Sequence, residues 1–281
     1  MKEFLKGSIF DKDWMQSKIT SRSISPVEKW VGYFLGSAGL FIIFYAVSAL
    51  KELYYTSVLP IDNIYGSGTY MILTSVTTVI GIAWSVLLSY LIEHTVSRAG
   101  KIRPYVLMGS LLMIVSGICI FQVPFDRGST ALLIWLYVQN ILFSGIAYQM
   151  WMQYINVLSL SSRSTVDKTQ TTALCKAGES IFSGFVVGFL ISSILYYSLL
   201  ANDATGDNWR LMVNVCALIS LPLVLCQYFF TKERITEDQK EMNVEQSNNN
   251  TIPLKMQFKA LLSDKYFILA MIMLFFFNAA I

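Results

Sequence analysis

The chain has 281 residues, of which 54% are hydrophobic and only 14% are charged, with a formal net charge of +3. This balance excludes an ordinary soluble domain, in which about a quarter of the residues are charged. The basic residues form no face or groove suited to nucleic acid, so we expect no nucleic-acid partner. Because backbone polar groups in lipid must be paired within their own segment, the composition predicts an all-α polytopic membrane protein.

Residues 1–29 are polar and basic, and they lack the apolar core and small-residue cleavage site of a signal peptide. We interpret them as a cytoplasmic amino-terminal segment. Apolar stretches long enough to cross a bilayer then follow one another between residues 30 and 230. The six predicted spans are residues 30–50, 68–92, 105–123, 130–158, 172–200 and 210–230.

A polar stretch at residues 231–265 separates the sixth span from a seventh apolar run at residues 266–281. As a helix this run would extend about 24 Å, which is shorter than the roughly 30 Å hydrocarbon core of a bilayer. We therefore predict a six-helix amino-terminal bundle at residues 30–230, a cytoplasmic linker and a truncated seventh helix. This organisation is typical of one half of a twelve-span transporter, so a missing carboxy-terminal bundle is an expected partner.

The basic residues are distributed unevenly between the two sides of the predicted spans. All but four of the 21 lysine and arginine residues lie in the amino terminus or in the loops on that side. Lys51, Arg127 and Arg210 lie in the opposite loops or at their edges, and Lys176 lies within a span. Because basic residues are retained in the cytoplasm, we expect a multi-pass protein of the cytoplasmic membrane whose amino terminus is cytoplasmic.

The turn between the second and third spans carries a recognisable motif. Glu93 is followed by Gly100-Lys101-Ile102-Arg103-Pro104-Tyr105, in which the glycine permits a tight turn and the proline suits the first turn of a helix. The motif resembles the loop between helices two and three of major facilitator transporters. The most similar form is that of the glycoside-pentoside-hexuronide:cation symporters, the melibiose permease group, with glutamate in place of aspartate.

Two later stretches support this resemblance, which covers about residues 28–281. Gly145-Ile146-Ala147-Tyr148 is similar to the GxxY motif of the family's fourth helix. Asn208-Trp209-Arg210 and Thr231-Lys232-Glu233-Arg234 are similar to the motifs that open and close its sixth helix. The resemblance implies sugar transport by symport, in which a small glycoside, sugar or similar polyol crosses the membrane.

The carboxylates with which this family binds its coupling cation are missing. The resemblance places them at Gly81 and Ser85 in helix two, at Ser37 in helix one and at Met152 in helix four. Sodium and similar hard cations need charged oxygen ligands. We therefore expect the usual cation site to be degenerate, and we predict no metal site.

The candidate substrate-binding residues come from helices one, four and five. Tyr148 lies beside Gln149, Gln153 and Asn156, whose amides are spaced to share a helix face and suit a hydroxyl-rich solute. Hydrogen bonding between helices is the alternative role for these amides. The resemblance adds Ser37, and it adds Lys176, which lies near the family's substrate-contacting arginine. Lys176 could instead pair with Glu179 near the headgroups.

The candidate gating residues are Glu93, Arg98, Gly100 and Arg103. We expect Glu93 to pair with Arg98 or Arg103 and to form a latch that keeps the cytoplasmic side closed. The sequence contains one histidine, His94, and no nucleophile beside a base, so neither catalysis nor a cofactor is expected. Because the family's carboxylates are missing, a membrane scaffold, a sensor or a non-transporting remnant is the alternative function.

Overall fold

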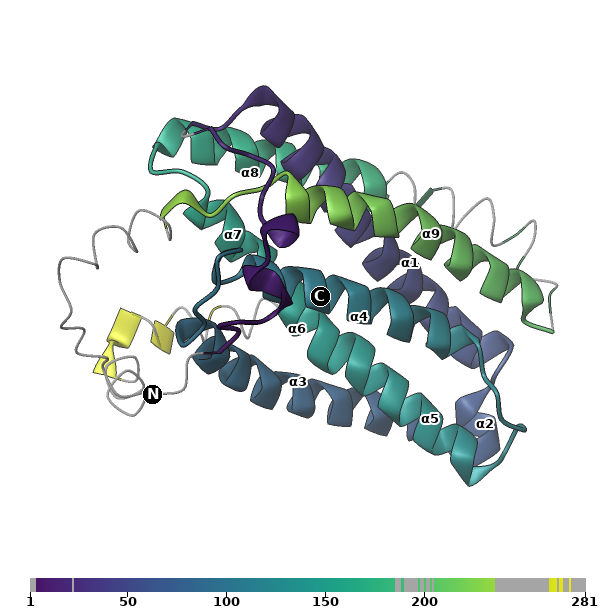
Figure 1. Cartoon of the computed structure of the whole chain (residues 1–281). Helices are drawn as coiled ribbons and strands as arrows, with labels where there is room; N and C mark the ends of the chain where they lie inside the picture. Colours follow the sequence, from purple (N-terminus) through teal and green to yellow (C-terminus); the bar gives the residue numbers. More distant parts are fainter. Residues whose placement is uncertain are drawn as a thin grey trace. The chain divides into compact units, whose positions relative to one another are not determined.

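The computed structural model describes residues 4–21, 23–184, 205–235 and 263–266, together with residues 188, 189, 197, 200, 203, 268, 269 and 273. The chain divides into two units, Met1–Asp238 and Gln239–Ile281. The helices labelled in Figure 1 belong to the first unit. Most of the predicted linker and of the predicted seventh span lies outside the described residues.

Within the described part of the chain, five helices are long and apolar enough to cross a membrane. They match five of the six predicted spans and confirm the all-α polytopic fold class. The five are Glu28–Ser57, formed by the π-helical segment η3 (Glu28–Leu35) and α1 (Gly36–Ser57); α3 (Thr69–Glu93); α4 (Arg103–Phe121); Thr130–Leu160, formed by α5 (Thr130–Asn140), the π-helical segment η4 (Ile141–Ala147), α6 (Tyr148–Trp151) and α7 (Tyr154–Leu160); and α9 (Asp207–Phe229).

The shorter helices complete the first unit. α2 (Ile61–Tyr65) connects α1 to α3, and η1 (Ile9–Asp11) and η2 (Asp13–Met15) are single 3₁₀ turns near the amino terminus. α8 (Thr165–Ser180) begins seven residues before the predicted fifth span at residue 172. Most of that span beyond residue 184 lies outside the part of the chain that the structure describes.

The long helices of the first unit lie alongside one another in a bundle (Figure 1). α1 packs along α9, α4 lies between α9 and α6, α3 packs against η4, and α8 packs against η3. Their shared core is apolar and aromatic, with Phe41, Trp151 and Trp209 almost completely buried. The two π-helical segments therefore lie at contacts between helices.

Glycines allow α1 and α9 to approach closely. A Cβ atom added at Gly36 would lie 2.5 Å from the Cβ of Gln227 and 2.6 Å from its Cα, which is closer than real atoms pack. Gly32 is equally restricted by the backbone of Phe230. Small residues four positions apart are typical of closely packed membrane helices, so this pair has a packing role.

Replacement of Gly36 by leucine is therefore expected to destabilise the bundle by about 1–3 kcal/mol or more, because the new side chain overpacks the contact between α1 and α9. Thermal unfolding of the purified protein in detergent would measure the loss. Gly184→Leu is the matched control, because a Cβ atom at Gly184 has no neighbour within 4 Å among the described residues. Equal unfolding midpoints for the two variants would contradict the packing role.

The segments at the two ends of the first unit pack onto the bundle. Ser17 donates a hydrogen bond to the carbonyl of Thr231 at 2.8 Å, and the N–H of Lys18 donates to the carbonyl of Phe229 at 2.9 Å. Glu233 and Arg234 are 1% and 7% exposed. The first residues of the predicted linker, 231–234, therefore pack against the bundle.

A carboxylate organises the turn before α9. Asp203 accepts hydrogen bonds from the hydroxyl of Thr205 and from the backbone N–H groups of Thr205, Gly206 and Asn208. The hydrogen bond from the Thr205 hydroxyl, with further contributions from these N–H groups, lowers the pKa of Asp203. The charge also lies near the positive end of the helix dipole, which favours the start of α9 at Asp207.

Candidate functional site

A cavity of about 280 Å³ lies between α1, α3 and the helix Thr130–Leu160, which we call the fourth long helix. We call it the central cavity. It contains hydroxyl groups, one amide and aromatic rings, and it includes two of the predicted substrate-binding residues. Its lining residues are Phe44 and Ser48 of α1, Thr78, Gly81 and Ile82 of α3, and Ser144, Tyr148 and Gln149 of the fourth long helix.

The position of the cavity follows from the local shape of the fourth long helix. The π-helical segment η4 widens the turns between Ile141 and Ala147, and such segments are frequent at functional sites. Gly145 faces Gly81, and a Cβ atom at Gly81 would lie 3.4 Å from the Cα of Gly145. This close approach brings Ser144 and Gln149 next to α3.

One wall of the central cavity is aromatic. Phe44 stacks on Tyr148 with ring centroids 4.9 Å apart, and on Trp151 at the same distance. Stacked rings form a flat apolar surface, while the hydroxyl of Tyr148 and the amide of Gln149 supply polar groups at its edge. Such a surface can pack against the apolar face of a sugar ring.

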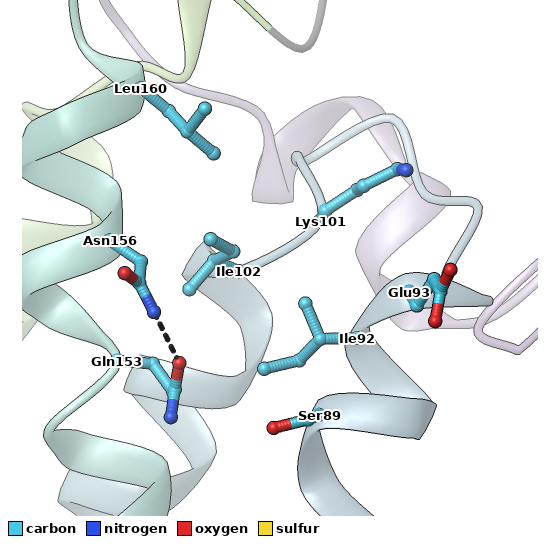
Figure 2. Close-up of a pocket in the computed structure, with 8 residues that line it drawn as sticks. All are labelled: Ser89, Ile92, Glu93, Lys101, Ile102, Gln153, Asn156 and Leu160. Carbon is cyan, nitrogen blue, oxygen red and sulfur yellow. Dashed lines mark hydrogen bonds between the residues drawn. The ribbon is translucent and has the colours of Figure 1, made fainter. Parts of the chain in front are cut away.

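Gln153 and Asn156 line a different cavity, of about 330 Å³, which we call the loop cavity (Figure 2). Asn156 donates a hydrogen bond to the side-chain oxygen of Gln153 at 2.7 Å. The fourth long helix is interrupted at Met152 and Gln153, between α6 and α7. The three amides therefore do not line one cavity, because Gln149 lies in the central cavity and the other two lie in the loop cavity, although the amide of Gln153 donates to the carbonyl of Gln149 at 3.3 Å and α3 lines both cavities.

Ser37 lines neither cavity. It is 1% exposed, and its hydroxyl donates a hydrogen bond to the carbonyl of Phe34 at 2.9 Å and lies 3.5 Å from the carbonyl of Cys175. A Cβ atom at Gly178 would lie 2.9 Å from this hydroxyl. The structure therefore gives Ser37 a packing role between α1 and α8, in place of the predicted contact with solute.

Lys176 forms an ion pair with Glu179 at 2.5 Å, as expected from their spacing on α8. The side chain of Lys176 is 56% exposed and that of Glu179 is 18% exposed. Glu179 also accepts a hydrogen bond of 3.4 Å from the hydroxyl of Tyr45 in α1. Tyr45 adjoins Phe44, so this network reaches the aromatic wall of the central cavity, although Lys176 lines neither cavity.

The loop motif binds a carboxylate other than the predicted one. The backbone N–H groups of Lys101, Ile102 and Arg103 donate to the carboxylate of Glu233 at 2.9, 2.9 and 2.7 Å. Gly100, with a φ of +112°, lies directly against that carboxylate. The negative charge therefore occupies the N-terminus of α4, where backbone N–H groups have no partner within the helix.

The two arginines of the motif also have partners other than Glu93. Arg103 is 4% exposed, donates to the carbonyl groups of Ala99 and Tyr228, and lies over the ring of Tyr228 at 4.7 Å. Arg98 forms an exposed ion pair with Asp13 at 3.3 Å. The predicted latch between Glu93 and these arginines is thus wrong, and Glu93 lines the loop cavity with Lys101 (Figure 2).

A buried ion pair involves the residue that follows Glu233. Arg234 donates to both oxygens of Glu28, at 2.9 and 2.6 Å, and to the carbonyls of Ser161, Ser21 and Ser23. Glu28 is completely buried. This pair joins the start of the first long helix to the segment after α9.

Several residues of the site were not predicted from the sequence. They are Phe44, Ser48 and Ser144 of the central cavity, and Glu233 of the loop. The spacing of Phe44 and Ser48 on one face of α1 is a signal that could have identified them. Within the described residues, no group of three histidine, cysteine or acidic residues is placed to hold a metal ion.

Helices of membrane length, packed together in a bundle with no strand among the described residues, define an all-α polytopic membrane protein. The model of the MFS/sugar transport protein family matches residues 32–281, so the chain belongs to this family and the resemblance in its sequence is confirmed. The chain is 25% identical to the uncharacterized symporter YnaJ of Bacillus subtilis (strain 168) over 226 residues, which are 79% of this chain and 47% of the relative.

The chain is also similar to the isoprimeverose transporter of Lactiplantibacillus pentosus. The two are 22% identical over 253 residues, which are 87% of this chain and 48% of the relative. The chain thus spans about half the length of these curated relatives.

Proposed function

We propose that this protein is part of a secondary transporter that moves a small glycoside, sugar or similar polyol through the central cavity. The observation that carries the proposal is the pairing of a stacked aromatic wall with amide and hydroxyl groups inside a helical membrane bundle. The volume of about 280 Å³ is near the lower limit for small-molecule sites, so this half of the site would hold a single sugar ring.

The proposal includes a second helical bundle and the orientation of the chain in the membrane. Solute sites of such carriers lie between two bundles that rock against each other. Helix α3 is the most exposed of the five spans and lines both cavities, which supports contact with a further bundle on that side. The distribution of basic residues supports a cytoplasmic amino terminus in the cytoplasmic membrane.

We further propose that the usual sodium site of this family is not functional here. The lining of the central cavity contains no carboxylate, and Gly81 faces Gly145. The hydroxyl groups of Thr78 and Ser85 donate to carbonyls of their own helix. Neutral groups of this kind are poor replacements for the hydration shell of sodium.

The test is uptake of labelled isoprimeverose by vesicles that contain the complete encoded carrier, with unlabelled glycosides as competitors. We expect saturable uptake, and we expect Gln149→Leu to raise the KM about tenfold because one or two hydrogen bonds to the solute are lost. Gln122→Leu is the matched control, since Gln122 contacts Asn214 outside both cavities.

Absence of saturable uptake for every glycoside tested would contradict transport. Binding of isoprimeverose without flux would instead favour the sensor alternative. Equal KM values for the two glutamine variants would contradict binding of the solute in the central cavity.

A further inference from the structure

One ammonium group lies beside the middle of a neighbouring span. Lys51 is near the C-terminal end of α1, but its side chain points back along the helix, and its Nζ lies 3.5 Å from the hydroxyl oxygen of Ser144. Ser144 is near the middle of the span Thr130–Leu160. The sequence had placed Lys51 at the edge of an outer loop, so the structure corrects this placement.

The direction of the side chain has a simple cause. Side chains on a helix tilt toward its N-terminus, so a lysine near the C-terminus of a span tilts toward the membrane interior. Phe44, Ser48 and Lys51 are four and three residues apart, so they lie on one face of α1. Phe44, Ser48 and Ser144 line the central cavity, so the ammonium group lies directly behind one lining residue, Ser144, although Lys51 itself is not part of the lining.

No ion pair joins Lys51 to an acidic side chain within the described part of the chain. Its recorded contacts are the hydroxyl of Ser144 and the ring of Phe143, whose centroid is 5.8 Å away. Glu52, the next residue, is exposed. Of the other helices that line the cavity, α3 has only Glu93 at its end and residues 130–160 have no charge. The charges of α8 that reach the aromatic wall are paired with each other, since Glu179 accepts from Tyr45 and forms an ion pair with Lys176.

An ionisable side chain at this depth is costly unless it faces water, a partner or a ligand, and such residues generally have a function. We propose that the ammonium group of Lys51 supplies the positive charge that a coupling cation would otherwise bring to the central cavity. The solute can then bind without such a cation. The inference rests on the function proposed above and deepens it. A second cation in the same cavity would be repelled by the ammonium group.

The first test needs no solute and uses the purified protein. Thr78 lines the cavity and is exposed, so Thr78→Asp adds a carboxylate there without displacing a neighbour. With Lys51 present, we expect the new carboxylate to pair with it, and the unfolding midpoint to be the same in sodium chloride and choline chloride. In the double variant Lys51→Met/Thr78→Asp, sodium should raise the midpoint by several degrees.

Lys51→Met/Thr78→Asn is the matched neutral control and should not respond to sodium. An equal response to sodium in Thr78→Asp and in the double variant would overturn the proposal, because Lys51 would then not fill the site. A double variant that does not respond to sodium would also overturn it, because the position could not hold a cation.

The second test follows uptake of labelled isoprimeverose by the complete carrier. We expect Lys51→Met to reduce uptake at least tenfold in either salt and Lys51→Arg to keep a substantial share of it. Wild-type uptake retained by Lys51→Met, or equal loss in both variants, would overturn the role of the charge. If the wild-type carrier takes up no glycoside, the proposed function fails while the sodium measurements still decide the role of Lys51.

Discussion

Arg234→Met is expected to destabilise the bundle by about 3–5 kcal/mol, because it leaves the carboxylate of Glu28 buried without its partner. Arg234 donates to both oxygens of Glu28 and to three backbone carbonyls, and these contacts join residues from four separate parts of the chain. Methionine has a similar length but supplies none of these hydrogen bonds. The carbonyl groups of Ser21, Ser23 and Ser161 would lose a donor as well.

Thermal or denaturant unfolding of the purified protein in detergent would measure this loss. Glu28→Gln/Arg234→Met should recover part of the stability, since the charge left by the single change is removed, and the double-mutant cycle isolates the coupling between the two side chains. Arg98→Met is the control for an exposed pair and should change stability by less than about 1 kcal/mol. Similar losses for Arg98→Met and Arg234→Met would contradict the special role of the buried pair.

The spans were predicted well because long apolar segments are a strong signal, whereas the end of the first span was not. The first span was expected to end at residue 50, since Lys51 and Glu52 follow, but α1 continues to Ser57. Charged residues do not break a helix, and here Lys51 turns inward while Glu52 remains exposed. Hydropathy reports where apolar residues stop, which is not where a helix must end.

The candidate site was predicted in part for a different reason. Tyr148 and Gln149 were identified because a motif and a local spacing mark them, and both line the central cavity. Ser48 and Ser144 carry no local signal, because they become significant only where α1 meets the fourth long helix. The amides of Gln153 and Asn156 were expected to act together with Gln149, but they line the loop cavity while Gln149 lines the central cavity.

The loop motif shows what can and cannot be predicted from residues that are close together in the sequence. Gly100 and Arg103 were identified correctly as part of a structured turn, but the carboxylate that binds the turn is Glu233, 130 residues from Arg103 along the chain. Glu93 was chosen because it is near in sequence. A stretch of backbone N–H groups has no side-chain signature, so only the folded chain shows which carboxylate they bind.

Glu233→Gln is expected to open the turn at residues 97–103, because the neutral amide keeps the shape of the side chain but loses its charge. Three backbone N–H groups at the start of α4 donate to this carboxylate, and hydrogen bonds to a charged acceptor are about twice as strong as neutral ones. The charge also interacts favourably with the positive end of the helix dipole, which contributes up to about 2 kcal/mol in a buried geometry.

Hydrogen exchange at the amides of Lys101, Ile102 and Arg103 would report this opening directly. A loss of about 2–3 kcal/mol corresponds to exchange about 30- to 150-fold faster at these three amides, with little change in the core of α1. Glu93→Gln makes the same chemical change on the carboxylate that the sequence had favoured, and it should leave exchange in the turn unaltered, since Glu93 lines the loop cavity. Faster exchange in Glu93→Gln than in Glu233→Gln would restore Glu93 as the residue that holds the turn, and would show that the contact with Glu233 is not what stabilises the start of α4.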